Sequence, residues 1–591
     1  MEFLTQNFVP LLFAGLLLFL LTGFPVAFSL AATGLTFGVI GMWADLFPQA
    51  LFQALPLRIF GIMQNDTLLA IPFFTLMGII LQRSGMAEDL LETVGQVFGP
   101  LRGGLALAVI FVGALLAATT GVVAAAVISM GLISLPIMMR YGYNRAVATG
   151  TITASGTLAQ AIPPSLVLIV MADQLGRSVG DMYSGALIPG LLLVALYALF
   201  IIALAIFKPS WVPALPPEAL IYKEANGATG HKSLFALLLI SGGIGYLWSQ
   251  FHEQIVNPMV QRSTAAPADE ILVMSMTVAS FTALGLAIAS RLLRLNLFSK
   301  LSERVTFVLI PPLVLIFLVL GTIFLGIATP TEGGAMGATG ALIMALARRR
   351  LSFDLLKQAL DSTARLSCFV LFILIGSTVF SFTFNAADGH IWVEHLFDKL
   401  PGGQLGFLIA VNLLIFVLGM FIDFFEIAFI VIPILAPVAE KMGIDLIWFG
   451  VIIAMNLQTS FLTPPFGFAL FYLRSVAPKN DYNDRVTNER IPAITTSQIY
   501  KGSIAFIILQ LIMVATVISF PNLVTGGMEK GPKVDLNTIE LEAETGNYGK
   551  VDPMQGFGLP QPGTQPEAPA GDAKEEDPMD AIRRSLEQEK K

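Results

Sequence analysis

The chain has 591 residues, of which 55% are hydrophobic and only 13% charged, and its mean hydropathy is +0.77. Soluble globular proteins carry roughly 25% charged residues, so an enzyme built of several globular domains is excluded. A single cysteine, Cys368, excludes a disulfide framework and a thiolate metal site. Of the net charge of −7, −6 lies from Pro521 onward, and the nearly neutral remainder argues against a nucleic-acid partner.

Apolar runs of about the length that crosses a bilayer recur along the chain. The run beginning at Phe8 has no basic segment before it and no small-residue cleavage site after it, so we expect a span and no cleavable signal peptide. The runs predict an all-α polytopic membrane protein with about 12 spans. They lie at 8–22, 24–43, 68–82, 146–172, 184–207, 233–249, 271–290, 305–327, 333–347, 366–386, 446–473 and 502–520.

Two further stretches, 105–138 and 405–438, each contain two apolar arms that are short for a crossing. We interpret each as a re-entrant hairpin that enters and leaves the membrane on one side. Two short ordinary spans are the alternative, and both interpretations leave the rest of the topology unchanged.

The orientation follows from the distribution of Lys and Arg in short loops. With the N-terminus outside the cytoplasm, 21 basic residues upstream of the tail fall in inside loops and 5 in outside loops. Both termini are therefore predicted to lie outside the cytoplasm. The tail 521–591 is acidic, rich in Pro and Gly and poor in aromatic residues, and is predicted to be disordered.

The chain carries signs of an internal repeat with a shift of 301 residues. Residues that end or interrupt helices coincide under this shift: Pro136 with Pro437, Gly142 with Gly443, and Pro163-Pro164 with Pro464-Pro465. Each half then holds five crossings, and the insertion between them adds two. An odd number per half predicts an inverted-topology repeat, the architecture of secondary transporters. The predicted parts are 1–207, the insertion 208–304, 305–520 and the tail 521–591.

Two spans are interrupted by consecutive prolines among polar residues, at Pro163-Pro164 and at Pro464-Pro465. Proline has no N–H and disfavours helix in the residue before it, so each pair frees several carbonyls. Such backbone is tolerated at membrane depth only inside protein or against water or an ion. Carbonyl and hydroxyl oxygens are ligands for a hard cation such as Na⁺. The candidate Na⁺ ligands are Thr120, Ser155, Thr157, Pro163, Asn456, Thr459, Thr463 and Pro464.

The predicted hairpin tips face these interrupted spans and supply helix N-termini, which attract anions. The first tip is Thr119-Thr120-Gly121, and the second contains Asp423 and Glu426, three residues apart. Ionisable groups within a membrane usually line a polar path, and their sign suits cation coupling or hydrogen-bond donation to a substrate. The candidate substrate and tip residues are Thr119, Gly121, Gln458, Asp423 and Glu426.

Two other features have plainer interpretations. Pro311-Pro312 lies in a span without polar neighbours, which predicts an ordinary proline kink. Glu332 lies at the corner Thr329-Pro330 before a span, where we favour a structural role.

Several motifs together resemble one family. They are Ile71-Pro72-Phe73-Phe74, the stretch 328–333, the stretch 155–165, and Asn456 through Gly467 with its Thr-Pro-Pro-Phe-Gly core. This combination resembles the large membrane subunit of the tripartite ATP-independent periplasmic (TRAP) transporters over about 1–210 and 300–525.

The resemblance implies Na⁺-driven import of a small organic acid across the bacterial inner membrane by an elevator-type movement of hairpins and broken spans. It implies two protein partners, a small four-span membrane subunit and a periplasmic solute-binding protein, and it places sodium sites between the hairpin tips and the broken spans. The first tip differs from the family's usual Ser/Gly-rich turn. The insertion and the tail resemble a longer branch of the family.

Other classes of membrane protein remain as alternatives. A stand-alone ion-coupled organic anion transporter or antiporter of the same superfold is the first of these. An ion channel lacks the expected rings of charged side chains. An intramembrane protease would need a second intramembrane Asp or an intramembrane His, and all four His are placed in loops or at span ends. No P-loop motif is present to bind ATP, so we expect an ion gradient to drive the transport. We expect the protein not to be an enzyme.

Overall fold

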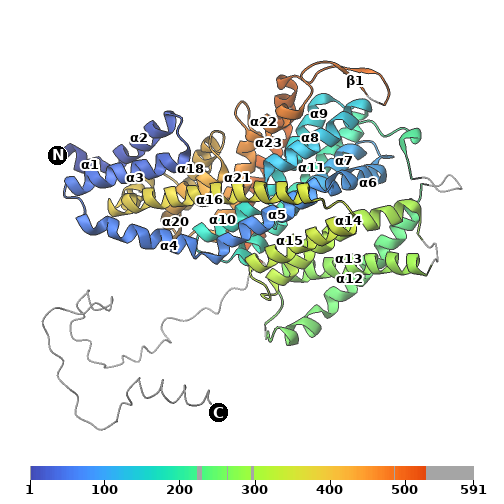
Figure 1. Ribbon diagram of the computed structural model, residues 1–591, viewed down its shortest axis with the longest axis horizontal. Coiled ribbons are helices and arrows are strands. Elements are labelled where there is room, and N and C mark those ends of the chain that lie inside the picture. The colour runs from blue at the N-terminus through green and yellow to red at the C-terminus, as the bar shows by residue number, and fades with distance from the viewer. Residues whose placement is uncertain (1, 223–228, 263, 294–297, 485, 527–591) are drawn as a thin grey trace, which may run out of the picture. The chain divides into compact units, whose positions relative to one another are not determined.

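The computed structural model describes residues 2–222, 229–262, 264–293, 298–484 and 486–526, and in this part the fold is helical apart from one short pair of strands (Figure 1). Residues 527–591, which make up most of the predicted tail, lie outside the described residues. Among the described residues, nine helices are long and apolar enough to cross a membrane. The expectation of an all-helical, multi-span membrane protein is therefore confirmed.

The first half of the chain contains two hairpin arms and one interrupted span. Its elements are α1 (Glu2–Gln6), α2 (Phe8–Leu21), α3 (Val26–Trp43), η1 (Gln49–Ala54), α4 (Leu55–Met63), η2 (Asp66–Leu69), α5 (Ala70–Arg83), α6 (Met86–Phe98), α7 (Gly104–Thr120), α8 (Val123–Arg140), α9 (Arg145–Thr157), η3 (Leu158–Gln160), α10 (Leu166–Gln174) and α11 (Val179–Phe207).

The insertion contributes two long helices that pack against each other. After η4 (Pro209–Trp211) and η5 (Pro217–Ala219) come α12 (His231–Met259) and α13 (Ala268–Leu292), and α13 also packs on α14 (Lys300–Phe324) (Figure 1). At the α12–α13 turn, His252 and Arg262 both contact the buried carboxylate of Glu270, at 2.9 and 2.7 Å. His252 lies within α12, three residues beyond the end of the predicted span 233–249, because α12 continues to Met259.

The second half of the chain begins with α14. Its elements are α14, α15 (Pro330–Ala347), α16 (Phe353–Ala386), α17 (Gly389–Asp398), α18 (Gly403–Leu418), α19 (Phe424–Glu426), the π-helical η6 (Ile427–Val431), α20 (Ile432–Lys441), α21 (Leu446–Leu462), α22 (Phe468–Val476), the antiparallel pair β1 (Tyr482–Asn483) and β2 (Arg490–Ile491), α23 (Thr496–Ser519) and α24 (Asn522–Thr525).

Several local features recur 301 residues apart in the two halves. Gly142 and Gly443 both have positive φ, at 75° and 73°. Asn144 and Asp445 each cap the following helix with a side-chain oxygen. The bonds Pro163-Pro164 and Pro464-Pro465 are both cis. The same order of a left-handed glycine, a capping side chain and a cis Pro-Pro bond therefore begins and interrupts both α9–α10 and α21–α22.

Among the described helices of nine residues or more, α4, α6 and α17 lie outside the predicted spans and hairpins. In α6, apolar residues alternate with Glu88, Asp89 and Glu92, so the segment is amphipathic and does not read as a membrane span. By contrast, α14 runs without a break through Pro311 and Pro312, as expected for proline within a span that lacks polar neighbours.

Close helix contacts place the family-like motifs next to each other. Gly334 and Gly337 of α15 face Phe74 and Met77 of α5, and a Cβ at Gly337 would lie 2.6 Å from the Met77 sulfur. Thr331 at the start of α15 donates to the Asp66 carbonyl at 2.5 Å. Small residues at such contacts let two membrane helices approach closely.

The contact of α9 with α23 brings two backbones so close that a side chain cannot be added without loss of stability. A Cβ at Gly150 would lie 2.2 Å from the Gly502 carbonyl oxygen, a backbone atom that cannot rotate away. We expect Gly150→Ala to destabilise the protein by about 1–3 kcal/mol through overpacking, measured as a lower melting temperature in detergent. Gly243→Ala is the control, since nothing lies within 4 Å of its added Cβ. Equal melting temperatures for the two variants would contradict this packing.

Candidate ion and substrate site

The first interruption lies between α9 and α10 and is wholly buried. After Thr157 the chain forms the 3-10 turn η3 and then a non-helical stretch from Ala161 to Ser165. The Ser165 hydroxyl donates to the carbonyls of Ala159 and Gln160, at 2.9 and 3.0 Å. It therefore satisfies part of the backbone that the two prolines release.

The second interruption lies between α21 and α22 and is more open. The Thr463 hydroxyl donates to the Thr459 carbonyl at 2.7 Å, and the Tyr500 hydroxyl donates to the Pro465 carbonyl at 3.1 Å. Phe466 is 46% exposed, whereas every residue from Val147 to Ala172 around the first break is buried. The two breaks thus share their sequence pattern but differ in access to their surroundings.

A glutamine of α23 joins the two interrupted helices. Its amide nitrogen, Gln510 Nε2, lies 3.5 Å from Thr157 Oγ1 at the end of α9 and 3.4 Å from Gln458 Oε1 in α21. Gln510 is 1% exposed, and Thr157 and Gln458 are fully buried. The two halves of the chain therefore meet through polar side chains at the level of their breaks.

Buried amides around this junction keep unused hydrogen-bonding capacity. Within the described residues, Gln160 Oε1 and Nε2, Gln458 Nε2 and Gln510 Oε1 have no hydrogen-bond partner. Such atoms are costly in a low-dielectric interior, and native proteins usually satisfy them. Amide and hydroxyl oxygens are also the donor set of a hard monovalent cation, so these residues fit Na⁺ as a transported ion.

The candidate hydroxyl ligands point their protons at their own helices. Ser155 donates to the Thr151 carbonyl at 2.5 Å, and Thr157 to Ala154 at 2.9 Å. In α21, Thr459 lies 3.5 Å from the Met455 carbonyl. A hydroxyl that donates in this way keeps oxygen lone pairs for a cation.

Asn456 of α21 makes a hydrogen bond to the second hairpin. Its amide nitrogen donates to the Asn412 carbonyl of α18 at 2.7 Å. Gly419, at the end of α18, also meets α21, where its Cβ would lie 2.8 Å from Ser460 Cβ. The hairpin and the interrupted helix therefore form one packed unit.

The tip of the first hairpin rests on the start of α10. The tip turns at Gly121, which has φ of 59°, and a Cβ there would lie 2.9 Å from Leu166 Cγ. The tip residues Thr119 and Thr120 end α7, but their side chains are outside what the structure describes. Their predicted roles stay predictions.

The second tip meets the second break through aromatic rings, with 4.9 Å between the centroids of Phe421 and Phe466. Asp423 and Glu426 form a capping box at the start of α19: Asp423 Oδ1 accepts from the Phe424 N–H at 2.8 Å, and Glu426 Oε2 from the Asp423 N–H at 3.2 Å. Asp423 is thus the N-cap and Glu426 the third residue of the helix. Both carboxylates are engaged by backbone donors.

Next to this box, the π-helical turn η6 accepts a hydrogen bond from a neighbouring helix. The Ser377 hydroxyl of α16 donates to the Phe429 carbonyl. Glu332 likewise belongs to a capping box, in which its carboxylate accepts from the Thr329 N–H at 2.8 Å. A structural role was the favoured interpretation for Glu332, and this contact is of that kind.

Sequence reasoning missed Gln160 and Gln510. Gln510 is the one polar residue in the apolar stretch 504–515 of α23, a signal that could have marked it. Its neighbours lie 353 and 52 residues away, so nothing in the local sequence indicates which polar groups it joins.

A helical, multi-span chain built around two interrupted helices is a membrane transport protein, and comparison with known proteins gives its family. Residues 13–523 match the family described as the tripartite ATP-independent periplasmic transporter, DctM component. The chain therefore belongs to this family of transporter permeases, which are not enzymes.

Several curated relatives align over most of the chain. The C4-dicarboxylate TRAP transporter large permease protein DctM of Pseudomonas aeruginosa is 27% identical over 73% of this chain and 82% of its own. The isethionate TRAP transporter permease protein DctMQ of Oleidesulfovibrio alaskensis is 25% identical over 79% and 60%. The sialic acid TRAP transporter permease protein SiaT of Haemophilus influenzae is 22% identical over 86% and 66%.

The Gln510 junction can be tested through stability. Gln510→Leu leaves the side-chain Oε1 of Gln458 without its hydrogen-bond donor. We therefore expect the free energy of unfolding to fall by about 1–3 kcal/mol, seen as a lower melting temperature. Gln250→Leu on the exposed face of α12 is the matched control and should change little. A Gln510→Leu protein as stable as the control would contradict the junction.

Proposed function

We propose that this chain is the large membrane subunit of a sodium-coupled importer of a small organic acid. The observation that carries the proposal is the meeting of two proline-interrupted helices at Gln510, with buried hydroxyl and amide oxygens on both sides. Oxygen ligands inside a membrane protein suit a hard cation, and helix N-termini at a break suit an anion.

The proposed coupling follows from the charges. A carboxylate crossing the bilayer alone would bear a large desolvation cost. Sodium bound by the oxygens of Ser155, Thr157, Thr459 and Thr463 would offset the substrate's charge, so that movement needs both together. The names of three relatives mention C4-dicarboxylate, isethionate and sialic acid, all of them organic anions.

We further propose that the two halves have opposite orientations in a bacterial inner membrane, with both termini periplasmic. The landmarks 301 residues apart support the repeat, and the Lys/Arg bias supports the orientation. The proposed moving part consists of the hairpins α7–α8 and α18–α20 with the interrupted helices. The helices α2, α3, α14, α15 and α16 would form the static scaffold of an elevator.

The partners are proposed from the family. Its description names a tripartite periplasmic system, which supports a periplasmic solute-binding protein that delivers the substrate and a small four-span membrane subunit. The relative named DctMQ is longer than this chain, which covers 60% of it. Such a length leaves room for a fused small subunit.

Uptake into proteoliposomes tests the function. The large subunit, its small subunit and the binding protein would be reconstituted, and radiolabelled organic acids offered with and without an inward Na⁺ gradient. We expect saturable uptake that requires both the gradient and the binding protein. Uptake that ignores Na⁺ would contradict the coupling, and uptake without the binding protein would favour a stand-alone transporter.

Thr463 provides a test of the sodium site. Removing one oxygen ligand should raise the Na⁺ concentration for half-maximal uptake on the order of tenfold in Thr463→Ala. Thr516→Ala in α23 is the control, because its hydroxyl makes the same kind of bond, to Ile512 at 2.8 Å, away from the junction. The same Na⁺ dependence in both variants would remove Thr463 from the site.

Glu426 separates capping from coupling. Glu426→Gln keeps an oxygen that can accept from the Asp423 N–H but loses the charge, whereas Glu426→Ala loses both. We expect the alanine variant to lose about 1 kcal/mol of stability and the glutamine variant to keep its melting temperature but need more Na⁺ for uptake. Unchanged Na⁺ dependence in Glu426→Gln would limit this residue to capping.

A further inference from the structure

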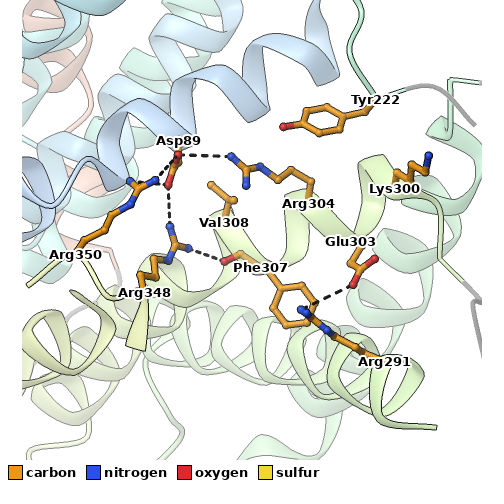
Figure 2. A pocket seen from close by; sticks show the side chains of 10 residues that line it. All are labelled: Asp89, Tyr222, Arg291, Lys300, Glu303, Arg304, Phe307, Val308, Arg348 and Arg350. Carbon is orange, nitrogen blue, oxygen red and sulfur yellow. Dashed lines mark hydrogen bonds and ion pairs between the residues drawn. The ribbon is translucent and has the colours of Figure 1, made fainter. Parts of the chain in front are cut away.

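A basic cavity lies away from the interrupted helices, among α6, α13, α14 and α15 (Figure 2). Its volume is about 530 Å³, and Tyr222 lies at its edge. Five basic side chains line it: Arg291, Lys300, Arg304, Arg348 and Arg350. The lining includes only two carboxylates, those of Asp89 and Glu303, so its formal charge is +3.

One carboxylate serves three of the guanidinium groups. Asp89 lies 2.9 Å from Arg350, 3.3 Å from Arg348 and 3.5 Å from Arg304 (Figure 2). Arg350 and Arg348 are also held by carbonyls, of Ser84 at 3.2 Å and Phe307 at 2.6 Å. A single negative charge thus orients three cations without neutralising them.

Arg304 is the least satisfied of the three. Its contact with Asp89 is the longest, and within the described chain its buried Nε atom has no hydrogen-bond partner. On the other side of the cavity, Glu303 reaches Arg291 only at 4.0 Å, and Arg291 lies over the Phe307 ring, 5.4 Å from its centroid. The cavity therefore presents unused cationic donors to an anion.

The place of the cavity indicates where that anion comes from. Its cations lie where α13 and α15 end and α14 begins, on the side that the Lys/Arg bias predicts to be cytoplasmic. Leu292 follows Arg291 in the chain and Leu346 precedes Arg348 by two residues, and they are 77% and 63% exposed. Apolar side chains beside a basic cavity at a helix end match the headgroup and acyl chains of a phospholipid.

We propose that this cavity binds the phosphate of an anionic phospholipid from the cytoplasmic leaflet. The headgroup phosphate takes its hydrogen bonds from Arg304, with the positive charge of Lys300 in the same lining, while the acyl chains lie along the exposed leucines. The site ties the insertion helix α13 to α6 and α15 through the lipid. An acidic peptide would satisfy the charges but not the apolar neighbours.

Lipid binding to the purified full chain tests this inference. Phosphatidylglycerol, phosphatidylcholine and inorganic phosphate would be titrated against the protein in detergent, with native mass spectrometry and melting temperature as readouts. We expect phosphatidylglycerol to bind and to raise the melting temperature, and the other two to do neither at the same concentrations. In Lys300→Gln/Arg304→Gln the lipid should bind on the order of tenfold more weakly.

Arg349→Gln is the control, because it removes a positive charge between Arg348 and Arg350 while Arg349 itself does not line the cavity. It should bind phosphatidylglycerol as the unaltered chain does. Equal binding by the double variant and the control would overturn the site. Saturation by inorganic phosphate at the lipid's concentration would overturn the lipid as its source. Because no transport is measured, these outcomes do not depend on the proposed import.

Discussion

The structure depends on one constraint, which is that backbone polar groups inside a membrane must find partners within the protein. At the consecutive prolines of two helices, backbone carbonyls lose their usual helical partners. Nearby hydroxyl groups donate hydrogen bonds to some of these carbonyls instead. Ser165 covers carbonyls at the first break, while Thr463 and Tyr500 do so at the second. The first hairpin tip packs on the start of α10, and α23 donates a hydrogen bond at the second break, so tertiary packing supplies part of what the four prolines leave unpaired.

Glycines allow the helices to pack closely. Gly150 against Gly502, and Gly376 against the Ala27 carbonyl, bring backbones closer than any side chain would allow. In a bilayer, apolar burial drives helix association weakly, so shape and close approach matter more. The same contacts leave polar side chains such as Gln510 facing other polar groups rather than lipid.

The site was only partly predictable from sequence. Consecutive prolines beside Thr and Ser marked both breaks, because proline's missing N–H is a local property. The Asp423–Glu426 capping box was hidden, since spacing of three fits both a helical face and a cap. The basic cavity was equally hidden, because Asp89 and Arg350 are 261 residues apart and only the packing of α6 on α14 and α15 brings them together.

The sequence by itself determined the helical membrane class and the two broken helices, because hydropathy and proline chemistry act over neighbouring residues. Tertiary structure alone decided which groups meet: Gln510 with Thr157 and Gln458, and Asp89 with three arginines. These contacts join residues remote in the chain, and their geometry depends on helix packing, which no local pattern encodes.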